Sequence, residues 1–538
     1  MPVGYIYRNP HPPSCKGPSG EEEGKRHGKA VTNPLFFLFY SFRATRKISR
    51  KLNNFAEMST MIRNFIHVLL LCTTLIGSLS CSRGHQPGQT VSHLVHQDWS
   101  LDVRDGLNCF MDNCAGMQNA YVVFDFDNTT SIFDVEEQLA IYQLETMSFA
   151  LDPEQLSKVL ATGLEPAQCA NWIRDISSAY SKLYTDYGPF TPKGLDEAML
   201  GTLHEDPQWL EFATKMRAMY DNVGEWASVD DSYNWILYWF CGMTEKEVYD
   251  IAYASHKKYG AVNTSVETWT SPSELKSSVG QVSISWTKGV QVSENIRELW
   301  KCLDENGIDV WVCSASGIDQ IMAAVDAFGL RDYCSGVLAM TISQDGSGLY
   351  KNSYDYKSGY AAIPASDGWT KGNQATGAQT AGPGKVTAIM NAIAPLYGGA
   401  TPLAGFMDST GDFNFCTEFS SLRTVVCFNR ANRKITDGGG LIAEVAIYEK
   451  ETLEYDYATA REAGNTIYLL QGRDENGLRS FRSSNKTLRY GSSEEKLFAN
   501  QDNEDQLAEM IRNKYTVKQA IDKYSSNFLK SYSGYHSK

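Results

Sequence analysis

Two carboxylates lie directly after an apolar run in the first half of the chain. Tyr121 to Thr130 reads Tyr-Val-Val-Phe-Asp-Phe-Asp-Asn-Thr-Thr, which predicts a buried strand that ends in Asp125 and Asp127, with Thr129 two residues further on. Open α/β sheets place their active sites at the carboxyl ends of such strands. Two acids there are unfavourable unless a cation or hydrogen bonds compensate their charge. Mg²⁺ prefers few carboxylates together with water and phosphate oxygens, so the pattern indicates phosphoryl chemistry.

Further polar clusters follow predicted strands, or open a helix, later in the chain. The strand Ile308 to Cys313 ends at Ser314-Ala315-Ser316-Gly317, and the strand Pro402 to Met407 ends at Asp408-Ser409-Thr410-Gly411-Asp412. Gly382-Pro383-Gly384-Lys385 opens a helix that we expect to run to about residue 396. Because parallel strand ends meet at one edge of a doubly wound sheet, these clusters should lie together with Asp125 and Asp127.

The alternation of strands and helices predicts an α/β protein with a Rossmann-like, doubly wound parallel sheet. A helix begins at Ser293 and closes at Gly307, and apolar residues at helical spacing support it. The interval from 134 to 285 carries helical patterns and many aromatic residues, and its length is that of a separate domain inserted after the first strand. The remaining expected elements are a helix over 93–112, a helix over 319–328, strands over 337–342 and 422–428, a long loop or flap over 343–384, a hairpin of 466–470 with 478–482, and terminal helices within 503–526.

We therefore expect six segments. They are a disordered or wrongly started extension (1–60), a signal segment (61–81), a tether with the first helix and first core strand (82–133), an inserted helical cap (134–285), the catalytic core (286–430) and a C-terminal hairpin and helix extension (431–538).

The signal segment resembles that of a bacterial lipoprotein. Arg63 flanks an apolar stretch from Phe65 to Leu79, which is shorter than the roughly 20 residues of a spanning helix, and Ser78-Leu79-Ser80-Cys81 follows. The resemblance implies export to the periplasm or cell envelope, with a lipid anchor on Cys81. Cleavage near Ser80 and an uncleaved anchor are the alternatives.

The charge of the remaining chain argues against a nucleic-acid partner. Beyond residue 80 it has 38 basic and 59 acidic residues, a net charge of −21. Such a body repels phosphate backbones, and no basic stripe compensates it. We expect a small phosphorylated substrate instead, and the acidic surface weakly favours a cationic one.

Together the clusters resemble the four motifs of the haloacid dehalogenase-like hydrolase superfamily, in the order that its phosphatases have. Asp125-Phe126-Asp127-Asn128-Thr129 matches the first motif, Ser314 the second, Lys385 the third, and Asp408 with Asp412 the fourth. The resemblance covers about 120–430, with the insertion as the cap. One departure is Met407, which stands where the fourth motif usually has glycine.

The resemblance and the chemistry of phosphate esters give each residue a role. Asp125 would attack phosphorus, and Asp127 would protonate the leaving alkoxide and then activate water, which requires a raised pKa. Ser314 would bind a phosphoryl oxygen, with Thr129, Ala315 and Ser316 beside it, and Lys385 would offset the charge of the aspartyl-phosphate. Asp125, the backbone carbonyl of Asp127 and Asp408 would hold Mg²⁺, and Asp412 would reach it through water or orient Lys385.

Residues just after the first motif resemble the phosphorylcholine phosphatase branch, which is close to phosphoserine phosphatases. In the run Asp134-Val135-Glu136-Glu137, the two glutamates match acids that accept a trimethylammonium group in that branch. Carboxylates and aromatic faces bind such a cation, and Trp235, Tyr238 and Trp239 share the spacing of one helical face. An acidic first helical turn, favoured by the helix dipole, explains the glutamates equally well.

Three functions are compatible with these residues. The first is a Mg²⁺-dependent phosphatase for phosphocholine or a related amino-alcohol phosphate. The second is a phosphatase for phosphoserine or other anionic monoesters. The third is a non-catalytic exported binding lipoprotein, against which the second acid, Asp127, argues because a binding protein has no use for it.

Overall fold

The computed structural model describes residues 90–431, 437–452, 465–476, 480–498 and 501–525. The expected N-terminal extension (1–60) and signal segment, including Cys81, lie outside the described residues. Within the described ranges, no helix combines the length and the apolar character needed to cross a membrane.

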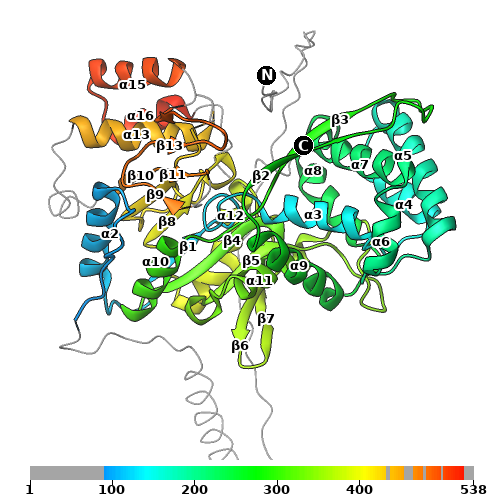
Figure 1. The fold of residues 1–538 in the computed structure, drawn as a ribbon. Coiled ribbons are helices and arrows are strands. Elements are labelled where there is room, and N and C mark those ends of the chain that lie inside the picture. Colours follow the sequence, from blue (N-terminus) through cyan, green and yellow to red (C-terminus); the bar gives the residue numbers. More distant parts are fainter. Residues whose placement is uncertain (1–89, 432–436, 453–464, 477–479, 499–500, 526–538) are drawn as a thin grey trace, which may run out of the picture. The chain divides into compact units, whose positions relative to one another are not determined.

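Eight strands form a central sheet in the order β10-β9-β8-β1-β4-β5-β6-β7 (Figure 1). The strands from β10 to β5 pair in parallel, and β6 and β7 continue the sheet antiparallel. This confirms the expected α/β class and the mostly parallel sheet. The strands are β1 (Tyr121–Phe124), β4 (Asp309–Gly317), β5 (Gly336–Met340), β6 (Tyr360–Ala365), β7 (Gly368–Ala375), β8 (Ala404–Met407), β9 (Thr424–Phe428) and β10 (Ile467–Gln471).

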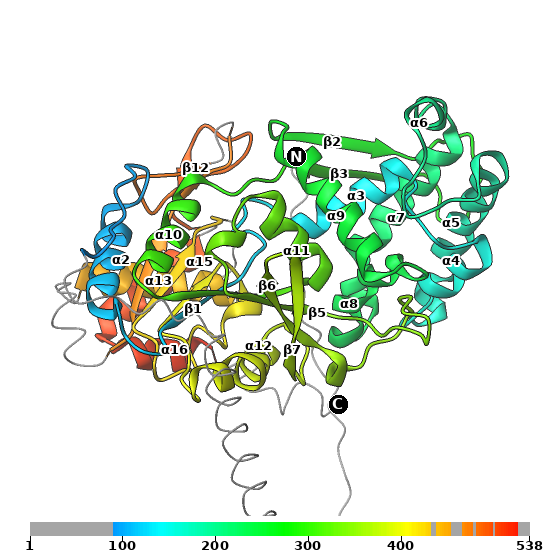
Figure 2. The ribbon, with the colours of Figure 1, turned by 90° about the horizontal axis from the view of Figure 1, so that it is seen from below.

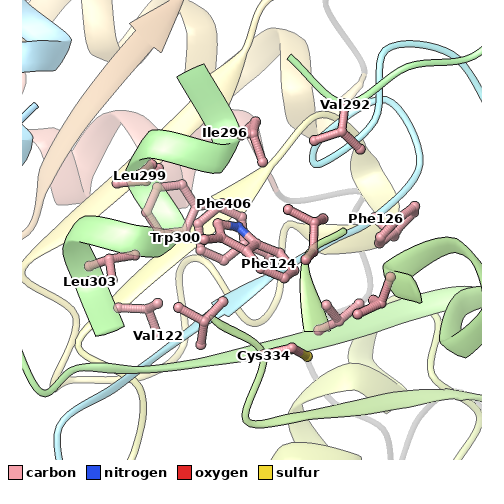
Figure 3. Close-up of a cluster of buried hydrophobic side chains, with 14 of the residues drawn as sticks. Val122, Phe124, Phe126, Val292, Ile296, Leu299, Trp300, Leu303, Cys334 and Phe406 are labelled. Carbon is pink, nitrogen blue, oxygen red and sulfur yellow. The ribbon is translucent and has the colours of Figure 1, made fainter. Parts of the chain in front are cut away.

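The central strand β1 is buried on both faces. Val122 and Phe124 belong to one hydrophobic cluster, and Tyr121 and Val123 belong to another. On the first face, Phe124 stacks on Phe406 of β8 and meets the edge of Trp300 (Figure 3). Because the chain order of the strands changes direction at β1, the carboxyl end of β1 is the point where a doubly wound sheet forms its site.

Helices cover both faces of the sheet. Residues of α2 (Leu101–Cys114), α10 (Glu294–Glu305) and α11 (Ile318–Ala327) pack in the cluster of Val122 and Phe124. The opposite cluster contains residues of α12 (Pro383–Ala388), α13 (Gly438–Thr452), α15 (Gln501–Asn513) and α16 (Val517–Tyr524).

Most helices of the chain between β1 and β4 pack in a third hydrophobic cluster, which also contains Ala323, Met340, Ile342 and Tyr350 from later in the chain. Figures 1 and 2 show its helices gathered beyond one end of the sheet strands β4 and β5. An antiparallel hairpin, β2 with β3, follows the helices and was not expected in an insertion predicted to be helical. The elements are α3 (Val135–Thr146), α4 (Pro153–Leu160), α5 (Pro166–Tyr187), α6 (Glu197–Leu203), α7 (Pro207–Trp226), α8 (Val229–Trp235), the 3-10 helix η1 (Ile236–Phe240), α9 (Glu245–Gly260), β2 (Ser265–Thr270) and β3 (Ser283–Lys288).

Two expectations about the later chain were wrong in part. Residues 343–384 were expected as a loop or flap, but they contain β6 and β7, whose Gly- and Ala-rich sequence hides a strand pattern. The run 466–470 was expected in a hairpin, but it forms β10, which pairs in parallel with β9. The sheet thus extends beyond residue 430. A small sheet then follows, made of β11 (Arg473–Asp474), β12 (Ser480–Phe481), β13 (Thr487–Leu488) and β14 (Glu495–Lys496).

The packing of α13 on β10 predicts a pH dependence of stability. Glu449 accepts a hydrogen bond of 2.9 Å from the backbone N–H of Tyr468, and burial raises the pKa of Glu449 from 4.5 to about 8. The folded state keeps a proton that the unfolded state loses, so this contribution to stability falls as the pH rises from about 4.5 through 8. The free energy of unfolding of Glu449→Gln should match that of the wild type near pH 4.5 and exceed it at pH 9, by on the order of a few kcal/mol.

Urea unfolding at both pH values measures the difference. Glu451→Gln, an exposed change on the same helix, is the matched control and should have no pH-dependent effect. Parallel pH profiles for the wild type and Glu449→Gln would contradict the expectation.

Candidate active site

The carboxyl end of β1 places Asp125 at the centre of the candidate site. The backbone N–H of Asp125 continues the β1–β8 ladder by donating to the carbonyl of Phe406 at 3.0 Å. Its side chain is buried, and its Oδ1 lies 2.6 Å from Nζ of Lys385. Thr129 Oγ1 donates to the other oxygen at 3.1 Å. Asp125 is therefore held at both oxygens in one orientation.

Lys385 bridges two acids from the first turn of α12. Its Nζ is 2.6 Å from Oδ1 of Asp125 and 2.6 Å from Oδ1 of Asp412. Burial alone would lower the pKa of Lys385, but the charges of Asp125 and Asp412 raise it well above its usual range. Lys385 is thus a fixed ammonium group. The preceding Gly382 has a φ of 52°, which favours glycine at the entry to this helix.

Among the described residues, the hydrogen bonds that the Asp127 side chain accepts come from neutral donors. Ser316 Oγ donates to its Oδ2 at 2.6 Å, and the backbone N–H of Val135 donates to its Oδ1 at 2.7 Å. Burial raises the pKa of Asp127 well above its usual range, and the charges of Asp134 and Asp125 raise it further. Because Asp125 contacts an ammonium group and Asp127 does not, a proton shared between the two acids resides on Asp127.

The serine cluster lies within the end of β4. The register between β4 and β5 shifts between Cys313 and Gly317, so this stretch leaves the regular ladder. Ser314 is buried, and its Oγ accepts from the backbone N–H of Ser316 at 3.1 Å. Ala315, between them, is partly exposed.

Asp408 and Asp412 complete an acidic cluster with Asp125. One carboxylate oxygen from each of the three buried residues lies within 4.8 Å of the others. Asp412 Oδ2 also accepts from Ser409 Oγ at 3.3 Å, so the turn after β8 orients it. Arg430 Nη1 donates to Asp408 Oδ2 at 3.1 Å.

The donor set fits a divalent cation. Burial, together with repulsion by Asp412, raises the pKa of Asp125 to about 8 even though Lys385 opposes the rise. Three ionised carboxylates would carry more negative charge than one lysine balances, which is why the pKa of Asp125 rises; a hard cation with oxygen ligands would relieve this repulsion and favour the ionised form of Asp125. Asp125, Asp408 and Asp412 are the side chains that would hold Mg²⁺. The roles that the sequence assigns to them and to the carbonyl of Asp127 stay predictions.

Met407, which stands where the motif has glycine, does not line this cluster. Its side chain is fully buried in the hydrophobic cluster that contains Tyr121 and Val123. Since side chains alternate along a strand, Met407 and Asp408 point to opposite sides. The methionine at this position therefore does not obstruct the acidic cluster.

The two acids at the start of α3 have different surroundings. Glu137 Oε1 lies 3.3 Å from Nη2 of Arg217, which balances its charge. Glu136 is enclosed, and burial raises its pKa well above the usual range, with Asp134 adding to the rise and the Gly317 N–H and Tyr220 hydroxyl opposing it. Its Oε1 has no hydrogen-bond partner among the described residues. Glu136 is the acid of this pair that can accept a ligand.

The three aromatic residues that were expected to form a cage lie in the hydrophobic core instead. Trp235, Tyr238 and Trp239 are at most 1% exposed and pack in the hydrophobic cluster of the inserted segment. Trp235 even donates its ring N–H to the carbonyl of Leu160 at 3.1 Å. Their spacing reflects core packing. The aromatic side chain near Glu136 is Tyr220, whose ring stands edge-on to Trp239 at 6.4 Å.

Four residues near the site were not predicted from the sequence. Arg430 is the second residue after β9, and the rule that polar residues at strand ends converge could have identified it. Arg217 and Tyr220 on α7, and Arg473 on β11, gave no comparable pattern, because single polar residues on a helix or in a turn are usually solvated.

Comparisons with known proteins describe the fold more than the activity. No protein-family model and no curated protein matches this sequence. A conserved, functionally unknown protein from Anaerococcus prevotii DSM 20548 is similar in structure, with 24% identity and a TM-score of 0.59 over 75% of this chain and 100% of that chain. Cytosolic 5'-nucleotidase IIIB bound to cytidine aligns with 13% identity over 61% of this chain and 78% of that chain, at a TM-score of 0.26. The first of these shows a shared fold, and the second is too distant to support an argument.

The acidic cluster predicts that Mg²⁺ stabilises the protein. Binding to the folded state alone should raise Tm as the Mg²⁺ concentration exceeds the Kd. Asp408→Asn should weaken the apparent affinity by roughly tenfold or more, since it removes a ligand. Thermal unfolding in a Mg²⁺ titration measures this, with Asp98→Asn, an exposed carboxylate, as control. An equal Mg²⁺ response in both variants would place the ion elsewhere.

Proposed function

We propose that this protein is a phosphatase of the haloacid dehalogenase-like type, which hydrolyses a small phosphate monoester through an aspartyl-phosphate. The observation that carries the proposal is the unequal pair of acids after β1. Asp125 contacts the Lys385 ammonium at 2.6 Å, whereas Asp127 takes hydrogen bonds from neutral donors. An ionised nucleophile beside a protonated acid is what transfer of a phosphoryl group from an alcohol requires.

In the proposed reaction, a carboxylate oxygen of Asp125 attacks phosphorus and the bond from phosphorus to the alkoxide breaks. Asp127 gives its proton to the departing oxygen. It then takes a proton from the water that attacks the aspartyl-phosphate, which releases inorganic phosphate and restores Asp125. Lys385 offsets the negative charge near Asp125 throughout, and Ser314 and Thr129 are placed to hold phosphoryl oxygens. Mg²⁺, when bound by the acidic cluster, would neutralise phosphate charge.

The substrate class follows from Glu136. An enclosed carboxylate oxygen without a partner favours a substrate that brings a positive group, such as phosphocholine or another amino-alcohol phosphate. Phosphoserine also carries an ammonium group, but its own carboxylate would be repelled by Glu136, although Arg217 lies nearby on Glu137.

A panel of phosphate monoesters, assayed with and without Mg²⁺, tests the proposed function. We expect Mg²⁺-dependent release of phosphate, with kcat/KM for phosphocholine above that for phosphoserine, and loss of turnover in Asp125→Asn. Retained turnover in Asp125→Asn would overturn the mechanism. Binding of the esters without any release of phosphate would favour the non-catalytic binding protein.

Glu136→Gln tests the choice of substrate. We expect KM for phosphocholine to rise by roughly tenfold, a cost of about 1.4 kcal/mol, because a bound cation would favour the ionised form of Glu136 and glutamine cannot ionise, whereas KM for p-nitrophenyl phosphate should hardly change. Glu154→Gln, an exposed change at the start of α4, is the control. Equal effects on both esters would give Glu136 a structural role.

The cellular location stays a proposal. A protein with a lipoprotein-like segment ending at Cys81 would be anchored in the cell envelope and would meet phosphate esters outside the cytoplasm. We expect the substitution Cys81→Ser to release the protein from membranes.

A further inference from the structure

A buried arginine of the C-terminal segment contacts the loop that follows the two acids of the site. Arg473, on β11, is 1% exposed. Its Nη1 donates to the backbone carbonyl of Asn128 at 2.9 Å, and its Nη2 lies 3.3 Å from the side-chain Oδ1 of the same residue. Both contacts bridge 345 residues of sequence, so they join the C-terminal segment to the loop that follows Asp127.

The geometry points to Arg473 as a positioning residue for phosphoryl transfer, and we propose that it fixes Asp127 through Asn128. This inference rests on the proposed function, because it gives a role to the C-terminal segment in that same site. Asn128 directly follows Asp127 and lies one residue before Thr129, which contacts Asp125. Any rotation at Asn128 would move both the proton carrier and a partner of the nucleophile.

The backbone at Asn128 needs such support. Its φ is 60°, in the left-handed region, which asparagine enters more readily than most residues other than glycine but which is still sparsely populated. Its N–H makes a long bond of 3.3 Å to the carbonyl of Phe133, which has a φ of 72°. Two strained positions frame a short turn, and the guanidinium group binds this turn from outside.

Arg473 is itself fixed by a charged network. Glu475 Oε1 accepts from Nε and Nη2 of Arg473 at 3.0 and 2.8 Å, and its Oε2 pairs with Nε of Arg489 at 2.8 Å. Arg489 donates to the carbonyl of Arg430 at 3.0 Å, and Arg430 contacts Asp408 at 3.1 Å. The network thus connects the loop after Asp127 with the acidic cluster. All of its arginines and its glutamate lie after β9.

The small sheet places Arg473 within hydrogen-bonding distance of Asn128. A side chain at Gly472 would meet the carbonyl of Lys486 at 2.1 Å, so only glycine permits this approach of the backbone. The side chain of Thr487, on β13, donates to the carbonyl of Asn429, which anchors the small sheet beside the end of β9. The segment is therefore built onto the catalytic edge of the central sheet.

Arg473→Lys tests the inference, since lysine keeps a charge for Glu475 but cannot bind two acceptors of Asn128 as a planar fork. We expect kcat for the best ester of the panel to fall by about tenfold to a hundredfold, with KM changed less than about threefold, because a misplaced acid slows the reaction more than it weakens binding. Arg482→Lys is the matched control. It lies on the same segment, pairs with Asp474 and Glu495, and should keep the wild-type kcat.

Two further measurements separate positioning from general damage. Added guanidinium ion should restore part of the kcat of Arg473→Ala and should have no such effect on Arg482→Ala. Hydrogen exchange of the amides of 126–133 should quicken in Arg473→Lys while that of β1 stays unchanged. If Arg473→Ala does not fold, Asn128→Gly, which keeps the left-handed backbone, should still lower kcat with little change in KM.

The outcomes distinguish this inference from the proposed function. If the wild type hydrolyses no ester, the proposed function fails, and hydrogen exchange alone still shows whether Arg473 holds the loop. If the wild type is active and Arg473→Lys keeps its kcat, or loses it only through a raised KM, the positioning role is overturned. Unchanged exchange in 126–133 would overturn it as well.

Discussion

The site depends on one buried lysine between two buried carboxylates. Lys385 lies 2.6 Å from an oxygen of Asp125 and 2.6 Å from an oxygen of Asp412, and all three side chains are almost inaccessible. Charges buried in this way are stable only with close partners, so removing any one of them leaves the others uncompensated. The strands β1 and β8 and the helix α12 must therefore meet at one edge of the sheet. Their pairing and packing are the structural condition for the chemistry.

Around this group, similar side chains acquire different properties from their neighbours. Asp125 faces an ammonium group and Asp127 faces a hydroxyl and an amide, which separates a nucleophile from a proton carrier. Glu136 and Glu137 differ in the same sense, because Glu137 pairs with Arg217, whereas Oε1 of Glu136 has no hydrogen-bond partner among the described residues. In both pairs the sequence shows two acids, and the surrounding elements decide which one can react or bind a ligand.

Much of this arrangement could be predicted from the chain itself. The continuous apolar run Tyr121–Phe124 ends in an acid, and that pattern predicts the central strand and its site. Lys385 and Asp408 could be predicted because each follows a clear boundary between elements.

The core position of Trp235, Tyr238 and Trp239 could not be predicted, since helical spacing does not say whether a helix face meets a core or a ligand. Arg473 could not be found, because its contact with Asn128 depends on tertiary packing over 345 residues. The strand β10 was misassigned because a short apolar run fits a hairpin and a parallel edge equally well.

The central claim is that Asp125 becomes phosphorylated, and trapping the phosphorylated protein tests it most directly. In Asp127→Asn, p-nitrophenyl phosphate needs no acid for its leaving group, so the first step should proceed while hydrolysis of the aspartyl-phosphate is slow. We expect a burst of about one nitrophenolate per protein molecule, since each nucleophile reacts once. Peptide mass spectrometry after acid quenching should then locate the phosphoryl group on Asp125. A phosphoryl group on a peptide without Asp125, or the same burst in the double variant Asp125→Asn/Asp127→Asn, would contradict the account.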